Sequence, residues 1–446
     1  MRAEVERRQD RSLPWGFPVR HASDMAPMMA ATHDVFRAAD ELRAQLASNE
    51  RRLSFFFGAG TSMSVGLPGI QQLTEQVTKQ LDAKLQEQFS AIGADLPPGA
   101  NVEQVLDRIR LYREVIGKQP EREFCKIKGP KEARDLDTAI CRAISESVRG
   151  KQITSGEPHL IFAQWLRALH SRRDWPVEVF TTNYDVVFEE ALETSGVPFF
   201  DGFVGAVNPF FAPECIESEG TRTDAHVYPC KAWTRLWKLH GSINWHVRSG
   251  DSDTEQITRL SPSDDKAGEE LAIFPARDKY SQSRKLPFVA MQDRFRRFLS
   301  GGDRLLVILG YSFSDQHINE LILQALRSNP HLAITALVFG ERAEGENNTS
   351  HFLPERLAAY GREHRNLTIY GPDKASIGGI VAPWAATSRA AESKSWPFWD
   401  AEKETFRLGD FRAFARFLEM FIGFDPRTRA VTHLAAEKKV ELAPEV

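Results

Sequence analysis

The feature that most constrains the fold is a set of short, apolar runs that each end in glycine or small polar residues. The first run, Leu53–Phe57, reads LSFFF and leads directly into Gly58-Ala59-Gly60. A run without polar alternation is typical of a strand buried on both faces of a parallel sheet. Parallel strands need a crossover connection, which is usually a helix. We therefore expect strands and helices to alternate along the chain.

The pattern of the remaining chain agrees with this expectation. Further strands are expected at Val177–Thr181, Leu236–Leu239, Ile243–His246, Arg304–Leu309, Ala333–Phe339 and Leu367–Tyr370. Helices are expected at Asp34–Ala47, Gln71–Phe89, Val102–Ile116, Glu132–Val148, His159–Leu169, Tyr184–Thr194, Gln292–Leu299, Gln316–Arg327, Leu353–Tyr360 and Asp410–Ile422. This alternation predicts βαβ units and a parallel sheet.

Several stretches stand outside that alternation. Residues 70–170 predict a helical insertion, since no strand candidate interrupts them. Residues 201–232, rich in Gly, Pro and Phe, are expected to form a loop, and residues 247–270 a polar excursion. We expect a flexible segment over residues 1–33, one domain over residues 34–380, and a C-terminal helical extension and tail over residues 381–446.

Composition limits the classes of function. The net charge is −4, from 57 basic and 61 acidic residues, so there is no electrostatic case for direct, sequence-independent nucleic-acid binding. No stretch approaches the roughly 18 to 20 apolar residues that span a bilayer, and the N-terminus lacks the apolar region of a secretory signal. The four cysteines form no C-x-x-C pair. This usage predicts a cytoplasmic protein without a zinc site.

Two motifs follow the first two strands of the predicted sheet. In FFFGAGTSMSVGLPG, Gly58 and Gly60 permit a tight turn into a helix, whose N-terminus attracts anions such as pyrophosphate. Thr61 and Ser62 add hydroxyl groups, although the same pattern also fits a plain strand-to-helix turn. In VFTTNYD, residues 179–185, Thr182, Asn183 and Asp185 follow a strand end, where ligands of open α/β sheets bind. Asn183 is interpreted as functional, and Asp185 mainly as a helix cap.

Two further motifs end in the same way. In LWKLHGSINW, His240 follows a strand and precedes glycine, so it is a candidate general base or an ordinary structural histidine. In LLVILGYSFSDQHINELI, Gly310 and Ser312 are candidates to contact a ribose or phosphate, and Asp315 is a natural helix N-cap. Small polar residues at four strand ends favour a shared ligand site over coincidence.

Together, GAGTSxxxGLP, TTNYD, KLHGS and GYSFSD resemble the Sir2 (sirtuin-like) family in their order. They look most similar to its prokaryotic antiphage-defence branch, including Sir2 proteins paired with HerA-type ATPases. The resemblance covers roughly residues 50–380. It implies a Rossmann-like parallel sheet of six strands, with helices on both faces and NAD across its carboxyl edge.

The resemblance also assigns roles to residues. Asn183 and His240 match the family's catalytic asparagine and histidine. The implied NAD-binding residues are Gly58, Ala59, Gly60, Thr61, Ser62, Gly310 and Ser312, and we add Thr182 and Asp185 as candidates because of their place at the strand end. Deacylating sirtuins carry cysteine pairs after their histidine and read GxPDFR, whereas here no cysteine follows His240 and residues 66–70 read GLPGI. These departures favour an NAD+ glycohydrolase, the NAD-depleting effector of a defence system, with NAD as substrate and no zinc.

Three alternatives remain at this stage. One is an NAD-dependent protein deacylase or ADP-ribosyltransferase, which would consume a peptide together with NAD. Another is a sensor that binds NAD or ADP-ribose without turnover. The third is a nuclease, for which the sequence offers no paired-carboxylate metal motif.

An NADase must be controlled, because it would otherwise exhaust its own cell. The stretch from Ala382 onward predicts one main helix, which is too little for a sensing domain. We therefore expect a homo-oligomer controlled by a protein partner in trans, a HerA-type ATPase or another defence component, with any nucleic-acid link indirect. The helical insertion is the expected gate or assembly surface. Trp396, Phe398 and Trp399 are either a second contact or part of the protein's own core.

Overall fold

The computed structural model describes residues 31–149, 153–169, 173–217, 233–249, 255–260, 270–273, 287–340, 353–386 and 396–421. Most of the N-terminal segment expected to be flexible, residues 1–30, lies outside this described part. Within it, no helix is both long enough and apolar enough to cross a membrane.

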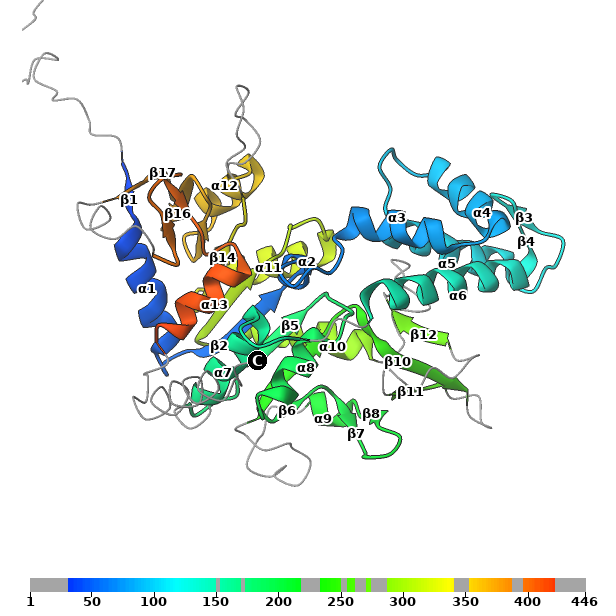
Figure 1. The fold of residues 1–446 in the computed structure, drawn as a ribbon, viewed down its shortest axis with the longest axis horizontal. Helices are drawn as coiled ribbons and strands as arrows, with labels where there is room; N and C mark the ends of the chain where they lie inside the picture. Colours follow the sequence, from blue (N-terminus) through cyan, green and yellow to red (C-terminus); the bar gives the residue numbers. More distant parts are fainter. Residues whose placement is uncertain are drawn as a thin grey trace, which may run out of the picture.

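A ten-stranded sheet runs through the centre of the described chain (Figure 1). In spatial order its strands are β1 (His33–Asp34), β17 (Ile380–Ala385), β16 (Lys374–Ile377), β15 (Leu367–Tyr370), β14 (Leu332–Leu337), β13 (Arg304–Leu309), β2 (Arg52–Phe57), β5 (Glu178–Thr181), β9 (Thr234–Lys238) and β6 (Phe199–Phe200). From β15 to β6 every neighbouring pair is parallel. The predicted parallel α/β sheet is therefore confirmed, whereas the expected number of six strands was wrong, because the sheet in the described residues has ten strands and β16 runs antiparallel to both of its neighbours.

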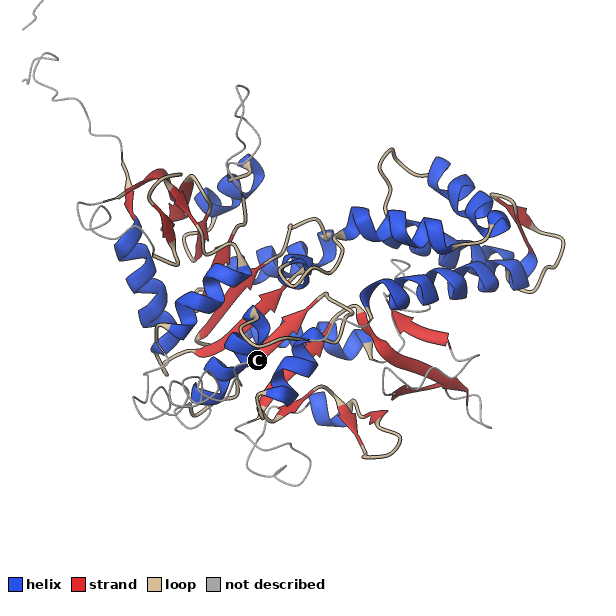
Figure 2. Ribbon diagram, viewed as in Figure 1, coloured by secondary structure: helices blue, strands red, loops and turns tan. Residues whose placement is uncertain are grey.

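Helices cover both faces of this sheet (Figure 2). On β2, Phe55 and Phe57 pack into one layer and Phe56 into the other, as the pleat of a strand requires. The first layer contains α1 (Val35–Ala47), α7 (Pro158–Leu169), α8 (Val187–Thr194) and α13 (Phe411–Glu419). The second contains α10 (Phe288–Ser300), α11 (Gln316–Ser328) and α12 (Glu355–Glu363). All three phenylalanines have no exposed surface, which explains the apolar run.

The order of the strands creates a switch point beside β2. From β2 the chain proceeds outward to β5 and β9, and it then returns to the opposite side of β2 to form β13, β14 and β15. The connections after β2 and β13 therefore leave neighbouring strand ends in opposite directions. In open α/β sheets this point of reversal, at the carboxyl ends of the strands, is where ligands bind.

The insertion is a separate helical body that extends away from the sheet (Figure 1). It consists of α3 (Ile70–Gln80), α4 (Ala83–Ala94), α5 (Val102–Ile116) and α6 (Gly129–Val148), which share their own apolar core. The single helix expected over Gln71–Phe89 is two helices, because Asp82 caps α4 through the amide of Leu85. A short hairpin, β3 (Glu123–Phe124) with β4 (Ile127–Lys128), also interrupts the helices.

The extent of the insertion differs from the expected residues 70–170. The last expected helix, α7, does not join the insertion core but packs against the sheet through Phe162 and Trp165. The hairpin was missed because its turn residues, Cys125 and Lys126, adopt positive φ without the Asn-Gly or Asp-Gly signal that usually marks such a turn.

A second, five-stranded sheet includes the expected strand Ile243–His246 and otherwise forms from segments that we expected to be irregular. Its order is β12 (Glu270–Ile273), β10 (Gly241–Ser249), β11 (Glu255–Arg259), β8 (Phe210–Phe211) and β7 (Phe203–Val204). The expectation of a loop over 201–232 and of a polar excursion over 247–270 was therefore wrong for the described residues. A short helix, α9 (Glu214–Glu217), follows β8. Partners distant in sequence create these strands, and a local pattern does not reveal them.

The C-terminal part is integrated into the main domain. β17 turns back on β16 at Gly378-Gly379, a hairpin signal present in the sequence, and β1 pairs with β17. Helix α13 begins at its cap Asp410 and packs on α7, whereas the expected end at Ile422 lies outside the described residues. Phe398 and Trp399 are 5% and 4% exposed, so this aromatic cluster belongs to the protein's own core.

Candidate active site

Two glycine-containing loops meet at the switch point. Gly58 lies between β2 and the short helix α2 (Ala59–Met63), and Gly310 follows β13 with φ +67°. A Cβ atom on Gly58 would lie 2.5 Å from the carbonyl oxygen of Gly310, and one on Gly60 would lie 2.8 Å from the Cα of Gly310. The Gly60 amide donates to the Gly310 carbonyl at 2.9 Å. The glycines are therefore required for direct backbone contact between the two loops.

Asn183 connects the loop after β5 to the loop after β2. Its side-chain nitrogen donates to the Gly58 carbonyl (3.1 Å), to Thr61 Oγ1 (3.1 Å) and to Ser62 Oγ (2.8 Å). Ser62 Oγ in turn donates to Asp185 Oδ2 at 2.6 Å. Thr61 and Ser62 are buried, so their hydroxyl groups hold the loops together instead of pointing toward solvent. Within the described residues, Asn183 Oδ1 makes no hydrogen bond, so this oxygen is the part of the side chain left for a ligand.

A buried lysine connects the loop after β5 to the loop after β9. Lys238, at the end of β9, is 1% exposed. Its ammonium group donates to Glu189 Oε1 and Ser242 Oγ, both at 2.8 Å, and to the carbonyl oxygen of Asp185. Burial holds the pKa of Glu189 above its usual range, although Lys238 opposes this shift. A buried ammonium group requires such partners, and here they fix the loop after β5 to the loop after β9.

His240 lies on the loop after β9 and is 8% exposed. Its Nε2 atom lies 3.2 Å from Asp315 Oδ2, on the loop after β13. Asp315 Oδ1 accepts hydrogen bonds from the amides of His317 (2.9 Å) and Ile318 (3.2 Å), which makes it the N-cap of α11. Burial favours a raised pKa for Asp315, but the hydrogen bond and charge of His240 and the two amides lower the pKa overall. Asp315 is therefore a carboxylate at neutral pH.

The other expected site residues lie on the same four loops. Thr182 is half-buried, and its amide donates to the Phe57 carbonyl at 3.3 Å. Asp185 is buried and accepts from the Val187 amide as a cap of α8, while Ala59 is exposed. Ser312 is exposed, and its hydroxyl lies 2.8 Å from that of Ser314. The fold thus brings the expected residues to one edge of the sheet.

Sequence reasoning missed three members of this cluster. Asp315 was interpreted as a cap alone, although its second oxygen faces His240. Lys238 received no role, although a lysine within the apolar strand LWKL signals a buried charge that needs partners. Ser314 repeats Ser312 two residues later and contacts it, which places both hydroxyls on one surface.

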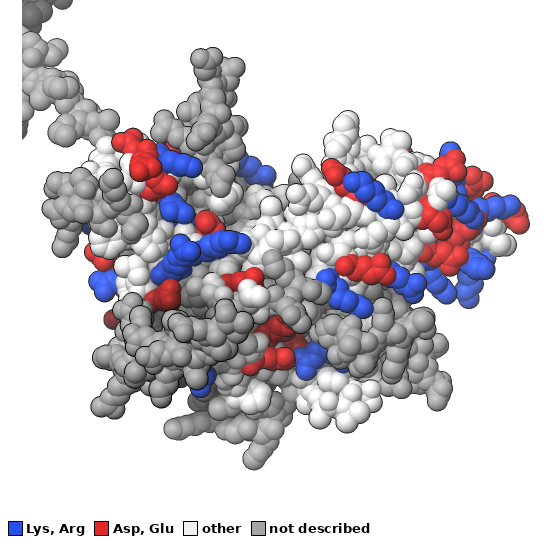
Figure 3. Space-filling view, viewed as in Figure 1, with Lys and Arg blue, Asp and Glu red and all other residues white. Residues whose placement is uncertain are grey.

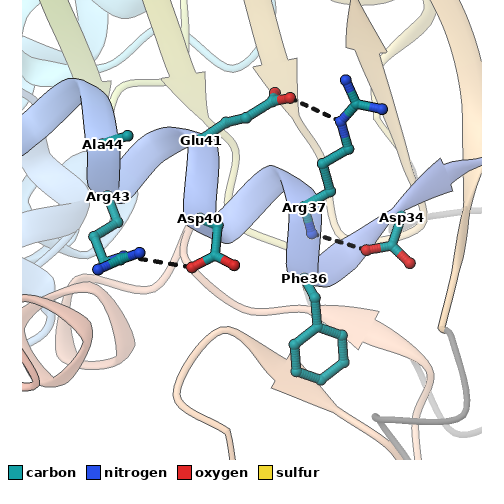
Figure 4. Close-up of a pocket in the computed structure, with 7 residues that line it drawn as sticks. All are labelled: Asp34, Phe36, Arg37, Asp40, Glu41, Arg43 and Ala44. Carbon is teal, nitrogen blue, oxygen red and sulfur yellow. Dashed lines mark hydrogen bonds and ion pairs between the residues drawn. The ribbon is translucent and has the colours of Figure 1, made fainter.

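Other candidate sites are weaker. The described residues contain no group of three or more His, Cys, Asp or Glu side chains that could hold a metal ion. A hollow on the outer side of α1 is lined by charged residues, but these pair with one another: Arg37 with Glu41 at 2.9 Å and Arg43 with Asp40 at 3.4 Å (Figure 4). This hollow lies on a surface helix and contains none of the residues of the four loops.

Charged side chains gather at the far end of the insertion (Figure 3). Acidic and basic groups are mixed there, and several form pairs: Lys84–Glu132, Lys126–Glu87, Lys128–Glu121 and Arg108–Asp95. Exposed pairs of this kind contribute little to stability. This surface therefore presents no concentration of one sign.

The fold and the site define an α/β protein with a polar site at the carboxyl edge of a parallel sheet. Residues 177–364, less than half of the chain, match the family model of the SIR2-like domain. Asn183, His240, Gly310 and Ser312 lie within that match, and the loop Gly58–Ser62 lies before it. No curated protein matches the chain in sequence.

Two solved structures are similar at low level. One is a mutant Sir2 homologue in complex with 2'-O-acetyl ADP-ribose, with 14% identity, a TM-score of 0.31, and coverage of 67% of this chain and 84% of that chain. The other, from work on the mechanism and regulation of Sir2 enzymes, has 13% identity, a TM-score of 0.32, and coverage of 69% and 86%. At these TM-scores the similarity adds nothing to what the strand order already shows.

Proposed function

We propose that this protein is an NAD+ glycohydrolase that cleaves the bond between nicotinamide and ribose. The observation that carries the proposal is the convergence of four loops at the switch point of the sheet, with Asn183 and His240 on neighbouring strand ends. Dinucleotides bind at this position in doubly wound sheets. The match of residues 177–364 to the SIR2-like domain supports NAD as the ligand.

The residues present fit a dinucleotide in two respects. The contact of Gly58 and Gly60 with Gly310 leaves no room for side chains, so backbone atoms alone form the surface between the ends of β2 and β13. The exposed hydroxyl groups of Ser312 and Ser314, on the loop after β13, supply hydrogen-bond partners for ribose or phosphate oxygens. The network of Thr61 and Ser62 then serves to position the loop, which revises the direct phosphate contact that we expected for these two side chains.

The proposed reaction assigns separate tasks to the two catalytic residues. Positive charge develops on the ribose as the bond to nicotinamide breaks, so the site must admit one nucleophile and exclude bulk water. Asn183, fixed through its nitrogen, presents its oxygen to orient the water or the nicotinamide. His240 takes a proton from a ribose hydroxyl or from the water, which is the role of a positioned general base. The products are nicotinamide and ADP-ribose, or a cyclic isomer.

The alternative reactions require other features. A protein deacylase or ADP-ribosyltransferase would bind an acyl-peptide beside His240, and zinc-bearing relatives carry cysteine pairs after the histidine, which this chain lacks. A sensor would keep the ligand intact. We favour hydrolysis without zinc over deacylation because no cysteine follows His240, and we favour turnover over a sensor because both Asn183 and His240 are present.

The insertion is well situated to control the reaction. Tyr184 directly follows Asn183 and packs against the insertion core, and Ile243, three residues after His240, is a buried member of that core. The Ile243 amide donates to the Tyr184 carbonyl at 2.9 Å. A movement of the insertion would therefore pull on both loops that carry the catalytic residues. We propose that assembly with further copies and with a partner in trans, such as a HerA-type ATPase, acts through this connection.

In the cell, the proposed role is NAD depletion in the cytoplasm as the effector of an antiphage defence system. The test is incubation of the purified chain with NAD, alone and with candidate partner proteins, followed by identification of products by mass. Release of nicotinamide with ADP-ribose or its cyclic isomer supports the proposal. Consumption of NAD only when an acylated peptide is present would favour the deacylase, and binding without turnover under every condition would favour the sensor.

A further inference from the structure

Asp315 has two oxygens with two different partners. Oδ1 caps α11 through the amides of His317 and Ile318, and Oδ2 lies 3.2 Å from His240 Nε2. A helix cap needs only one oxygen, so the contact with His240 is not explained by capping. We propose that Asp315 is a positioning residue that sets the tautomer of His240, a role that rests on the proposed NADase function for its catalytic meaning.

The carboxylate is held in place independently of His240. Tyr311 Oη donates to the Asp315 carbonyl oxygen (3.2 Å) and to Asn319 Oδ1 (3.0 Å), and Asn319 Nδ2 donates to the Phe313 carbonyl (2.7 Å). Phe313 adopts φ +56°, an unusual conformation for a bulky residue, which these bonds help to maintain. Because these hydrogen bonds fix the loop after β13 to the first turns of α11, the position of the Asp315 carboxylate is set first. The ring of His240 then takes the tautomer that this carboxylate requires.

The charge of Asp315 decides where the ring proton lies. A neutral imidazole carries one N–H, and a carboxylate accepts hydrogen bonds only. Nε2 must therefore carry the hydrogen that faces Asp315, and the lone pair lies on Nδ1. The proton removed from the hydroxyl group or water then moves to Nδ1, while Asp315 stays ionised and stabilises the imidazolium. Other charged groups on the adjacent loops have partners of their own, since Asp185 accepts from Ser62 and Lys238 donates to Glu189.

Asp315→Asn tests this role while preserving the cap. The amides of His317 and Ile318 require an oxygen at the position of Oδ1, so the new amide group turns its NH2 toward His240. That NH2 donates to Nε2 and forces the ring hydrogen onto Nδ1, which reverses the tautomer. We expect kcat for nicotinamide release to fall by about 10²- to 10⁴-fold, the contribution of a positioned base, with an unchanged KM for NAD.

The decisive readout is the tautomer itself. In protein with 15N-labelled histidine rings, the His240 signal is assigned by its loss in His240→Gln, and long-range proton–nitrogen correlations report which nitrogen carries the hydrogen. The proposal expects Nε2–H in the wild type and Nδ1–H in Asp315→Asn. The control is Asp34→Asn, an equivalent cap of α1 through the Arg37 amide (2.8 Å), which should change neither tautomer nor kcat.

The outcomes separate the two proposals. If the wild type releases no nicotinamide but the tautomer reverses in Asp315→Asn, the positioning role stands and the NADase function fails. If the tautomer is the same in both proteins, Asp315 is only a helix cap and the inference is overturned. An Asp315→Asn protein with wild-type kcat would likewise overturn it, because a cap preserved by Asn is all that a structural role requires.

Discussion

A substitution at Asn183 can separate an effect on catalysis from an effect on stability, because Asn329 has similar burial and similar hydrogen bonds but lies far from the candidate site. Asn183 is 7% exposed, and its side-chain nitrogen serves three acceptors on the loop after β2. Asn329 is also 7% exposed, and its side-chain nitrogen also serves three acceptors, the carbonyls of Leu299, Gly301 and Gly302. Asn329 precedes β14, at the opposite end of the strands from the candidate site.

Replacement of either residue by alanine removes a side-chain nitrogen with three acceptors, and Asn329→Ala also removes an oxygen that accepts from the His331 amide at 3.0 Å. In each case buried acceptors lose a donor, which costs about 1–3 kcal/mol of unfolding free energy. The loss at Asn183 is moderated, since Thr61 Oγ1 still donates to the Gly58 carbonyl and Ser62 Oγ still donates to Asp185. We therefore expect both variants to fold, with comparable destabilisation. Only Asn183→Ala should abolish nicotinamide release, because only this variant removes a side-chain oxygen at the proposed active site.

The assay combines urea unfolding with nicotinamide release from NAD. Equal destabilisation with activity lost in Asn183→Ala alone supports a catalytic role. Wild-type turnover in Asn183→Ala would refute that role. An equal loss of activity in Asn329→Ala would show that reduced stability, and not the chemistry of Asn183, accounts for the effect.

Further predictions concern the histidines, the metal content and the assembly. His240→Ala should abolish nicotinamide release with the fold retained, and normal turnover in this variant would exclude the proposed base. Elemental analysis should find no stoichiometric zinc, whereas about one zinc per chain would favour a deacylase. Burial lowers the pKa of His159 to about 3 from 6.5. Between these two pH values the unfolded chain binds a proton at this side chain and the folded chain does not. Stability should then fall by about 2 kcal/mol from about pH 7 to about pH 5, and His159→Phe should remove this dependence in urea unfolding, whereas an identical pH dependence in both proteins would contradict the assignment. Light scattering should show a homo-oligomer, and a monomer with full turnover that no co-expressed neighbour affects would contradict control by assembly.

Local pattern was sufficient for the elements that surround the candidate site. The segments before Gly58, Asn183, His240 and Gly310 are recognisable as strands from their apolar residues. The structure supplies the reason, because residues of these strands pack into the apolar layers on the two faces of the sheet. The ends of these strands were equally visible, since the backbone contact between the loops of Gly58 and Gly310 admits only glycine. The carboxyl edge as the candidate site followed from these strand ends alone.

The sequence was less informative where strands depend on distant partners. The second sheet pairs β10 with β11 and β12, and β11 with β8, and of its strands only the part Ile243–His246 was expected from the sequence. The helix α7 has the same periodicity as the insertion helices before it, so its pattern did not show that Phe162 would pack against the main sheet. In both cases the burial that defines the element comes from residues far away along the chain.

The sequence by itself determined which residues stand at the strand ends, because strand and helix periods are local properties of the chain. Only the tertiary structure decided how those residues are paired. Ser62 meets Asp185 across 123 positions of sequence, and His240 meets the second oxygen of a helix cap. Such pairings depend on the order and register of the strands, which are set by contacts between segments that are far apart in the sequence. A carboxylate has two acceptor oxygens, and the local sequence does not show which group the second oxygen will contact.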